Sequence, residues 1–416
     1  MKTLADIYGP GVFLAPRKFH VEGDWTAIGT AGGDLKSGLL LSSAGKIPLL
    51  AHRSVLSPWG LSAMADAGLT IEAEVEEYRG EAEYFAAVRR RARDGEVPAY
   101  YYPNPPGVLA DVAPFVDNAL HRLLNNKGAF GPHVDASLMP PRRVLHNPGA
   151  DEIRGLPLPV VLKVATDEPN GGGRGVLVCE KKRHLDRAAK QFAGVSTLLA
   201  EDFLDAAENW AVQCAVARDG TVQIEGASRQ VTSRSGIFAG SFKDRHQRPP
   251  DSALKVAEIA AKAGADLGYR GLCGFDLLVD RTGRAVLIDP NFRPTWSSPF
   301  LFHCDQMLDG RRGDCARFLT ARWPGRLDRF LAVCRKGIDA GWLIPVCTSD
   351  PRYGDLDASD AVVIMMVIGS DRREIESRER QLLRTGLAFT SMREAALKAT
   401  LPKLLNKVNR RIWRAR

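Results

Sequence analysis

The sequence lacks several signatures that would identify a common class of site. Its seven cysteines form no Cys-x-x-Cys pair, and its eight histidines form neither His-Glu-x-x-His nor His-x-His. Zinc-ribbon and thioredoxin-like sites therefore have no support. No apolar run approaches the roughly 20 residues that cross a bilayer, and the amino terminus, with Asp6 and no apolar core, does not resemble a secretory signal. We expect a cytoplasmic protein with reduced, mostly buried thiols.

Excess charge is also missing from most of the chain. The 416 residues carry a formal net charge of +8, but residues 397–416 alone hold seven Lys and Arg and no acid. The rest is near neutral, so a basic body that binds nucleic acid is not expected. The tail has apolar residues at helical spacing, which favours a basic amphipathic helix packed on its own protein or on a symmetry mate. Binding to an anionic membrane or to nucleic acid is the alternative.

The length predicts two or three domains with ordinary globular composition. In the first 125 residues, short apolar runs predict strands at 38–41 and 47–50, and periodic runs predict helices over 79–93 and 108–124. Farther on, the predicted strands and hairpins lie at 159–164, 175–179, 196–199, 210–224, 273–289 and 361–368. The predicted helices lie at 183–193, 251–266 and 371–384, and a mobile basic loop is predicted over 229–249.

A glycine loop, Gly171, Gly172 and Gly173, separates two apolar runs. Glycine lets backbone N–H groups approach phosphate oxygens, although a glycine hairpin is also a common flexible turn. The loop is not a P-loop, because it lacks Gly-Lys-Ser/Thr and a strand rather than a helix follows it. Lys163, within the preceding apolar strand, must find a counter-charge or reach solvent, and a nucleotide phosphate would serve.

Two acids and an amide meet in a second pattern. Asp276 lies in one predicted strand, Asp289 and Asn291 end the next, and the turn at 280–283 joins them. A small set of oxygen ligands suits Mg²⁺, whereas the alternative is a surface hairpin with solvated carboxylates. Arg293, two residues beyond Asn291, is placed to neutralise a transferring phosphoryl group or an anionic intermediate.

In order and spacing, these elements resemble the ATP-grasp superfamily over roughly residues 125–300. The resemblance implies a nucleotide held between two α+β subdomains, as in D-alanine–D-alanine ligase and biotin carboxylase. The expected fold class is therefore α/β, an ATP-grasp fold with added terminal regions. Its expected parts are an α/β domain at 1–125, a central lid subdomain at 126–205, a carboxy-terminal subdomain with the magnesium site at 206–330, and an extension at 331–416.

The resemblance also implies roles for single residues. It implies that two lysines, the glycine loop, the strand beside adenine and a ribose ligand bind the nucleotide. These residues are Lys127, Lys163, Gly171, Gly172, Gly173, Glu201, Asp202, Phe203, Leu204 and Glu208. It also implies that Asp276, Asp289 and Asn291 bind Mg²⁺, with Mn²⁺ as an alternative.

Two positions depart from the family pattern. The second metal ligand is usually Glu rather than Asp289, and several relatives carry Arg where this chain has Gly274. The role of that arginine would pass to Arg229 or Arg293, which are the expected catalytic residues.

The reaction implied by the resemblance is carboxylate–amine ligation. A carboxylate attacks the γ-phosphate of ATP, and an amine then displaces phosphate from the acyl phosphate, which forms an amide or peptide bond. We expect amino acids or peptides as substrates, a place in specialised natural-product metabolism, and a homodimer. The basic loop 229–249 is expected to close over the phosphates. Phosphoryl transfer to a non-carboxylate acceptor and a non-catalytic ATP-binding regulatory module remain the alternatives.

Overall fold

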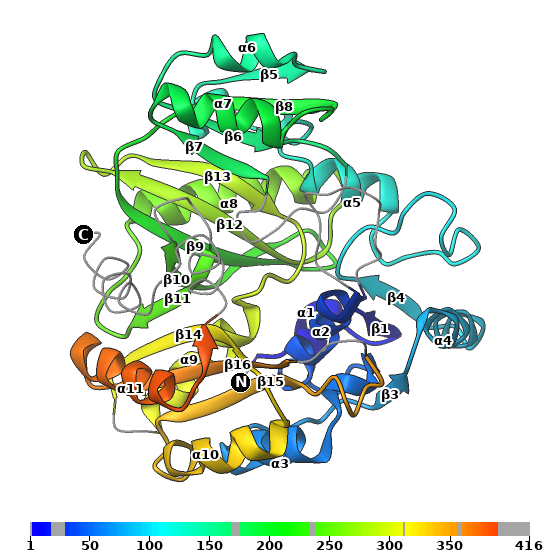
Figure 1. The fold of residues 1–416 in the computed structure, drawn as a ribbon. Helices are drawn as coiled ribbons and strands as arrows, with labels where there is room; N and C mark the ends of the chain where they lie inside the picture. The colour runs from blue at the N-terminus through cyan, green and yellow to red at the C-terminus, as the bar shows by residue number, and fades with distance from the viewer. Residues whose placement is uncertain are drawn as a thin grey trace.

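The computed structural model describes residues 2–17, 30–167, 175–232, 238–310, 313–356 and 360–389. The predicted glycine loop and the basic tail lie outside these ranges. Three sheets, each with its own helices, make up the described chain (Figure 1). Among the described helices, none combines the length and apolar character needed to cross a membrane.

The first sheet, the parallel sheet, has the strand order β3-β2-β1-β4. Its strands are β1 (Val12–Ala15), β2 (Leu49–His52), β3 (Val75–Tyr78) and β4 (Val97–Tyr100). Its helices are α1 (Leu4–Tyr8), α2 (Thr30–Leu40), α3 (Pro58–Asp66) and α4 (Glu81–Arg93). Parallel strands need crossover connections, and α2, α3 and α4 supply them.

Two predictions for this region are wrong. The apolar run at 38–41 belongs to the end of α2 and the turn after it, because a short buried apolar run fits a helix as well as a strand. The helix predicted over 108–124 is shorter, α5 (Asn118–Asn125), and turns precede it. The Asp117 side chain caps α5 by accepting from the backbone N–H groups of Ala119 and Leu120 at 2.8 and 3.0 Å.

The second sheet, the small sheet, is antiparallel with the order β5-β8-β6-β7. Its strands are β5 (Arg142–His146), β6 (Val160–Val164), β7 (Val176–Cys179) and β8 (Thr197–Asp202), and its helices are α6 (Ala150–Arg154) and α7 (Lys182–Gln191). The helices pack on each other and bury one face of the sheet, at the top of Figure 1. Short 3-10 turns precede it at Gly131–His133 and Ala136–Leu138, and another, Arg53–Val55, follows β2.

The third sheet, the long sheet, has nine strands, with β17 beside β14 and the others in the order β13-β12-β9-β10-β11-β14-β16-β15. They are β9 (Ala206–Val216), β10 (Val222–Thr232), β11 (Phe238–Asp244), β12 (Gly271–Asp280), β13 (Ala285–Asn291), β14 (Cys315–Trp323), β15 (Leu343–Ser349), β16 (Ala361–Gly369) and β17 (Ala388–Phe389). Its helices are α8 (Asp251–Asp266), α9 (Ser298–Asp309), α10 (Leu327–Asp339) and α11 (Arg372–Arg384). The predicted helix over 251–266 and the hairpin over 273–289 are confirmed; the expected domain limits stay a prediction.

The basic segment 229–249 is not a loop over most of its described length. β10 continues to Thr232, and β11 pairs with it antiparallel, with Arg229 opposite Phe242 and Gln230 opposite Ser241. The polar composition hid these strands, because the outer part of β10 is half-buried rather than packed in a core. Closure over phosphates therefore stays a prediction, and residues 233–237 at the tip lie outside the described ranges.

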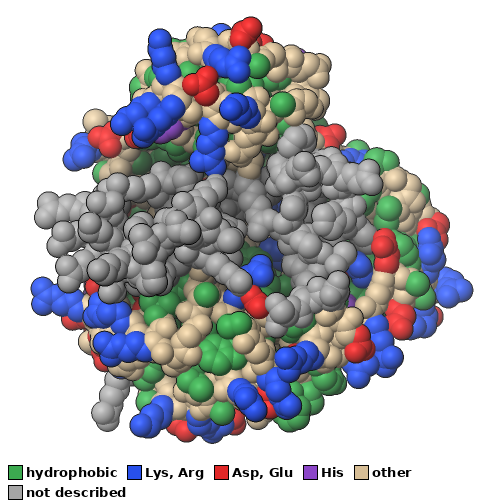
Figure 2. Space-filling view, viewed as in Figure 1, with side chains coloured by type: hydrophobic (Ala, Val, Ile, Leu, Met, Phe, Trp, Pro, Cys, Tyr) green, Lys and Arg blue, Asp and Glu red, His purple; other side chains and the backbone are tan. Residues whose placement is uncertain are grey.

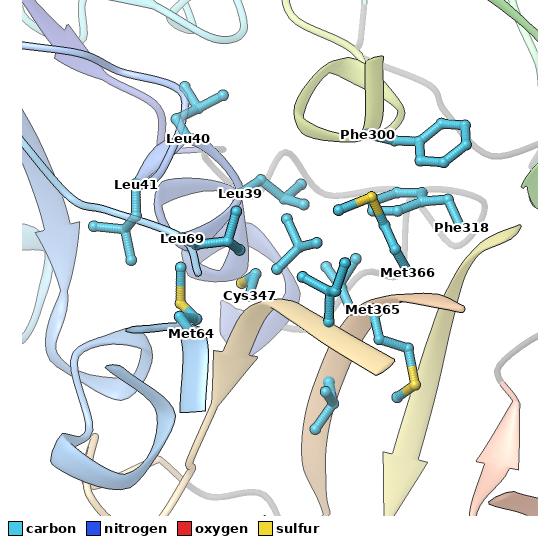
Figure 3. Packing of buried hydrophobic residues seen from close by; sticks show 14 of the residues in the cluster. Leu39, Leu40, Leu41, Met64, Leu69, Phe300, Phe318, Cys347, Met365 and Met366 are labelled. Carbon is cyan, nitrogen blue, oxygen red and sulfur yellow. The ribbon is translucent and has the colours of Figure 1, made fainter. Parts of the chain in front are cut away.

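One hydrophobic cluster, the shared core, joins the parallel sheet to the far half of the long sheet. Leu39, Leu41 and Met64 from the amino-terminal region pack in the same cluster as Met365 and Met366 of β16. Figure 3 shows the side chains of both regions in this one cluster, with Phe300 and Phe318 beside Met366. Burial of apolar surface thus holds the amino-terminal region against β14, β15 and β16.

All seven cysteines are buried and unpaired. Burial raises the pKa of the Cys179 thiol to about 11 and that of Cys214 to about 12. The predicted burial of the thiols is confirmed.

Candidate active site

The predicted metal ligands meet on neighbouring strands. Asp276 on β12 pairs with Asp289 on β13, and Asn291 pairs with Gly274. Paired residues of antiparallel strands present their side chains on one face, and so do residues two apart on a strand. The turn that aligns the strands is fixed by Asp280, whose Oδ1 accepts from the Thr282 N–H at 2.8 Å. We call Asp276, Asp289 and Asn291 the oxygen cluster.

The two acids of the oxygen cluster repel each other. Loss of solvent, followed by the charge of Asp289, raises the pKa of Asp276 to about 7, although a hydrogen bond from Gln230 opposes the rise. That bond joins Gln230 Nε2 to Asp276 Oδ1 at 2.5 Å. A cation already approaches the pair, because Lys127 Nζ lies 2.5 Å from Asp289 Oδ1.

This geometry fits a divalent cation. Among the described residues, no three His, Cys, Asp or Glu side chains gather as a metal site, so the donor set is two carboxylates and one amide. Two close, partly desolvated carboxylates favour a bound cation, and Mg²⁺ accepts a few protein oxygens and keeps the remaining positions for water and phosphate. The oxygen cluster therefore suits Mg²⁺.

Lys163 connects the small sheet to β13. Its Nζ lies 2.5 Å from Glu201 Oε2 on β8 and donates to the Ile288 carbonyl at 2.8 Å. Both side chains are buried, so the lysine finds its counter-charge inside the protein. Arg142 on β5, which sequence reasoning missed, lies 3.9 Å from Glu201 Oε1. No spacing in the sequence relates Arg142 to Glu201.

The segment predicted to contact adenine is the link between the small sheet and the long sheet. Glu201 and Asp202 end β8, Phe203 and Leu204 follow, and β9 begins at Ala206. Phe203 is 37% exposed, so part of this large apolar residue is open to a ligand.

Glu208 on β9 and Arg229 on β10 form an ion pair across these neighbouring strands. Arg229 Nη2 lies 3.0 Å from Glu208 Oε1, and the guanidinium lies 5.2 Å from the centre of the Trp210 ring. The Trp210 indole N–H donates to the second Glu208 oxygen at 2.5 Å. The expected ribose ligand and one expected catalytic arginine are thus neighbours.

Arg293 is buried beside the oxygen cluster. Its Nη2 donates to Asn291 Oδ1 at 2.5 Å, and its guanidinium lies 4.8 Å from the centre of the Tyr102 ring. The backbone between Asn291 and Arg293 is held from α5, because His121 Nε2 lies 2.9 Å from the Phe292 carbonyl. Asn125 Oδ1 also accepts from the Phe292 N–H at 3.1 Å. Sequence reasoning missed these two α5 residues, which no motif marks.

The absence of an arginine at position 274 has a steric reason. A Cβ at Gly274 would lie 2.6 Å from the Thr295 methyl carbon, closer than side-chain carbons approach. Thr295 is itself fixed, because Gln213 Nε2 donates to its hydroxyl at 2.7 Å. No larger side chain fits at position 274 without moving Thr295.

Two family profiles match the chain. The profile described as "L-aspartate--L-methionine ligase, ATP grasp" matches residues 140–291. The profile described as the amino-terminal domain of L-aspartate–L-methionine ligase matches residues 3–122. The two matches lie in sequence order and together cover more than half of the chain.

Solved structures show the same fold at low identity. An N5-carboxyaminoimidazole synthase from Aspergillus clavatus, solved with ADP and 5-aminoimidazole ribonucleotide, is 16% identical with a TM-score of 0.55, over 89% of this chain and 99% of that one. A Staphylococcus aureus N5-carboxyaminoimidazole synthetase with ADP is 12% identical with a TM-score of 0.55, over 84% and 93%. A Thermotoga maritima phosphoribosylamine–glycine ligase is 15% identical with a TM-score of 0.52, over 82% and 97%.

The predicted superfamily and α/β fold class are therefore confirmed. The chain belongs to the ATP-grasp family of L-aspartate–L-methionine ligase, and it is an ATP-dependent, ADP-forming ligase that joins a carboxylate to an amine.

Proposed function

We propose that this ligase activates the carboxyl group of aspartate, or of a closely similar amino acid, and joins it to the amino group of methionine. The main support for this proposal is that profiles of L-aspartate–L-methionine ligase match both the ATP-grasp region and the amino-terminal region. The match at residues 3–122 matters most for the substrates, because that region lies outside the ATP-grasp elements. The same proposal places the enzyme in the cytoplasm.

The nucleotide would lie between the small sheet and the hairpin of β12 and β13. Lys163 supports this placement, because its ammonium group reaches from β6 to the carbonyl beside Asp289. Lys127 supplies a second positive charge at Asp289. The exposed Phe203 ring suits the adenine base, and Glu208, opposite Arg229, is the proposed ribose ligand.

Asp276, Asp289 and Asn291 would hold Mg²⁺. When bound, this ion screens the phosphate charges and orients the γ-phosphate for attack. The chain's own contribution is to position the carboxylate and to exclude water. Arg293, which is buried and donates a hydrogen bond to Asn291, would neutralise charge on the reacting carboxylate and on the transferred phosphoryl group.

Two displacements would complete the reaction. A carboxylate oxygen attacks the γ-phosphorus, the bond to the bridging oxygen of ADP breaks, and an acyl phosphate forms. The amine nitrogen then attacks the acyl carbon, phosphate leaves, and the nitrogen gives up a proton as the amide forms. Neither of these two reaction steps requires a side chain of the described site to act as a covalent nucleophile.

The test is an incubation of the full chain with ATP, Mg²⁺, L-aspartate and L-methionine. We expect phosphate release that needs both amino acids, and a dipeptide mass in the products. Omitting either amino acid is the control. Release that depends instead on another pair from a pool of amino acids would refute the proposed substrates while leaving the ligase class intact.

A further inference from the structure

The three side chains of the oxygen cluster have donors from different parts of the chain. Cationic side chains contact two of them, through the pairs Lys127–Asp289 and Arg293–Asn291. The third differs, because Asp276 Oδ1 accepts from the amide of Gln230 on β10. One of the two carboxylates proposed to bind Mg²⁺ is therefore contacted by a donor that carries no charge.

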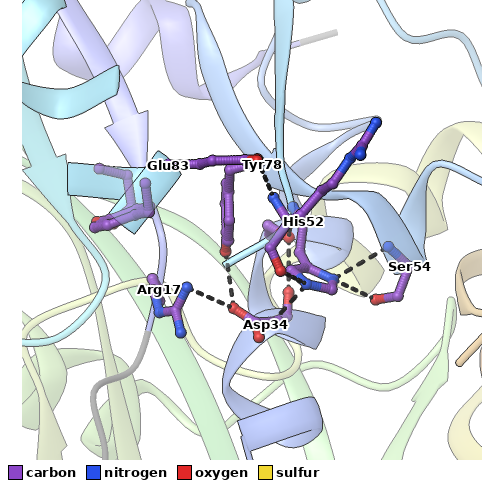
Figure 4. Close-up of polar contacts among 10 residues, drawn as sticks. Arg17, Asp34, His52, Ser54, Tyr78 and Glu83 are labelled. Carbon is purple, nitrogen blue, oxygen red and sulfur yellow. Dashed lines mark hydrogen bonds and ion pairs between the residues drawn. The ribbon is translucent and has the colours of Figure 1, made fainter. Parts of the chain in front are cut away.

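An acid of the parallel sheet shows how a buried carboxylate is neutralised instead. Asp34 on α2 is buried, accepts from the Tyr78 hydroxyl at 3.0 Å and lies 3.6 Å from Arg17 Nη1 (Figure 4). A guanidinium at this distance offsets the negative charge of the carboxylate. The amide that contacts Asp276 orients the carboxylate without offsetting its charge, as suits the ligand of a metal ion.

Gln230 reaches Asp276 across an intervening strand. β9 lies between β12 and β10, and Ala211 on β9 pairs with Asp276 on one side and with Ser228 on the other. Gln230 is two residues from Ser228, so its side chain lies on the same face of the sheet as that of Asp276. Because Ala211 carries only a methyl group, the longer side chain of Gln230 has room to pass over β9.

The backbone at Gln230 is fixed within the long sheet. Gln230 pairs with Ser241 on β11, and the Ser241 hydroxyl lies 2.6 Å from Ser297 Oγ. Arg317 on β14 donates to the Ser241 carbonyl at 3.2 Å and to the Ala239 carbonyl at 2.7 Å. These contacts fix the point from which the Gln230 side chain starts, which a geometrically precise site requires.

We propose that Gln230 is a positioning residue that keeps the Asp276 carboxylate in the orientation that binds the divalent cation. A carboxylate has two oxygens, so a bond at Oδ1 orients the group and leaves the other oxygen for the ion. Without the amide, part of the binding free energy of the ion is spent on orienting the carboxylate beside Asp289. The ion then binds more weakly, but it still binds. This inference rests on the proposed metal site and not on the identity of the amino acid substrates.

The first test measures how phosphate release by the full chain depends on Mg²⁺, at saturating ATP, L-aspartate and L-methionine. We expect Gln230→Met to raise the Mg²⁺ concentration for half-maximal release by about 10-fold, as is usual when the hydrogen-bond partner of a metal ligand is removed. At saturating Mg²⁺, kcat should return to within about threefold of the parent protein, because the bound ion then orients the carboxylate. Gln223→Met, a matched change at an exposed position of β10, should leave both quantities within twofold.

The second test is a binding measurement that needs neither turnover nor amino acids. The electron paramagnetic resonance signal of free Mn²⁺ reports the binding of this ion to the full chain in the presence of ADP. We expect Gln230→Met to raise the dissociation constant for Mn²⁺ by about 10-fold. Gln230→Asn keeps an amide that is one methylene shorter and cannot reach Asp276, so it should bind Mn²⁺ as weakly as the methionine variant.

Three outcomes would overturn the proposal. They are a Mn²⁺ dissociation constant for Gln230→Met within twofold of the parent protein, parent-like binding by Gln230→Asn, and a loss of turnover that saturating Mg²⁺ does not reverse. If Gln230→Met melts more than 5 °C below the parent protein, Gln230→Leu is judged by the same criteria. A parent protein that binds Mn²⁺ but forms no dipeptide refutes the proposed substrates alone. A parent protein that binds no Mn²⁺ refutes the metal site and this proposal together.

Discussion

Asp289 carries two neighbours of opposite sign, Lys127 at 2.5 Å and the carboxylate of Asp276 across the strand pair. Its charge therefore matters for the proposed metal site and for Lys127, whereas no described contact links its side chain to the predicted adenine or ribose residues. A substitution at this residue should therefore lower the turnover rate much more than it lowers the affinity for nucleotide.

We expect Asp289→Asn to lower kcat by at least about 100-fold, because a carboxylate ligand is lost where phosphoryl charge develops. The dissociation constant for ADP should change less than about fivefold. Steady-state phosphate release and calorimetric ADP binding measure the two quantities. Asp266→Asn, an exposed acid on α8, is the control. Turnover of Asp289→Asn within twofold of the parent protein would remove the oxygen cluster from the mechanism.

His303 gives the folded protein a dependence on pH. Burial lowers the pKa of His303 to about 4, so the folded state keeps the ring neutral, while an unfolded histidine has a pKa of about 6.5. Its stabilising contribution is full above pH 6.5 and is lost as the pH falls toward 4.

Between pH 7.5 and 5.5, this histidine should account for a loss of roughly 1 kcal/mol in the free energy of unfolding. Denaturant titrations at the two values measure the loss. His303→Gln keeps a nitrogen donor for the Ser42 hydroxyl, which lies 2.9 Å from Nε2, but does not titrate. The variant should lose less stability than the parent protein on acidification, and an equal loss would contradict the assignment.

At the scale of elements, α5 acts as a support for the end of β13. His121 and Asn125 both bond to the Phe292 backbone, and Phe292 stands between Asn291 and Arg293. The proposed metal ligand Asn291 and the arginine thus depend on a helix that lies about 170 residues earlier in the sequence.

Asn125→Ala should lower kcat by about 10-fold, because the Asn291–Arg293 backbone loses one of its supports and active-site geometry is sensitive to small displacements. The effect should be larger on kcat than on ADP affinity. Asn125→Asp keeps the acceptor for the Phe292 N–H and should retain more activity than the alanine variant. Equal activities for the two variants would mean that this hydrogen bond does not position the site.

The hairpin of β12 and β13 shows what sequence patterns could predict. Asp289 and Asn291 are two residues apart, and a short turn joins their strand to that of Asp276, so local spacing was enough. Lys127 with Asp289 and Arg142 with Glu201 are contacts between distant segments, which no local pattern encodes. The far part of β10, beyond the predicted strand that ends at residue 224, was missed for a different reason, since its residues are polar and half-buried rather than an apolar alternation.

At the scale of the whole molecule, the parallel sheet and the long sheet share one core. Gly38 on α2 lies at the contact, and a Cβ there would lie 2.5 Å from Cys347 Sγ on β15 and 2.9 Å from Val55. The visible described surface, by contrast, carries interspersed acidic and basic side chains (Figure 2), as expected for a body near neutral charge.

Gly38→Ala should therefore destabilise the protein by about 1–3 kcal/mol, because the added methyl group overpacks this contact. Alanine favours a helix more than glycine does, so the sign of the effect separates packing from helix propensity. Gly149→Ala, where a Cβ meets no atom within 4 Å, is the control. A stabilised Gly38→Ala variant would show that α2 can move away from β15.

Chemical labelling of the buried thiols would report when each region of the protein opens. Cys179 lies in the core of the small sheet, Cys214 and Cys273 lie under α8, and Cys304, Cys315, Cys334 and Cys347 lie in the shared core. A thiol reagent can reach each of them only when its surroundings open. The order in which the seven cysteines are labelled in the native protein should therefore report whether the chain opens in separate units and which unit opens first.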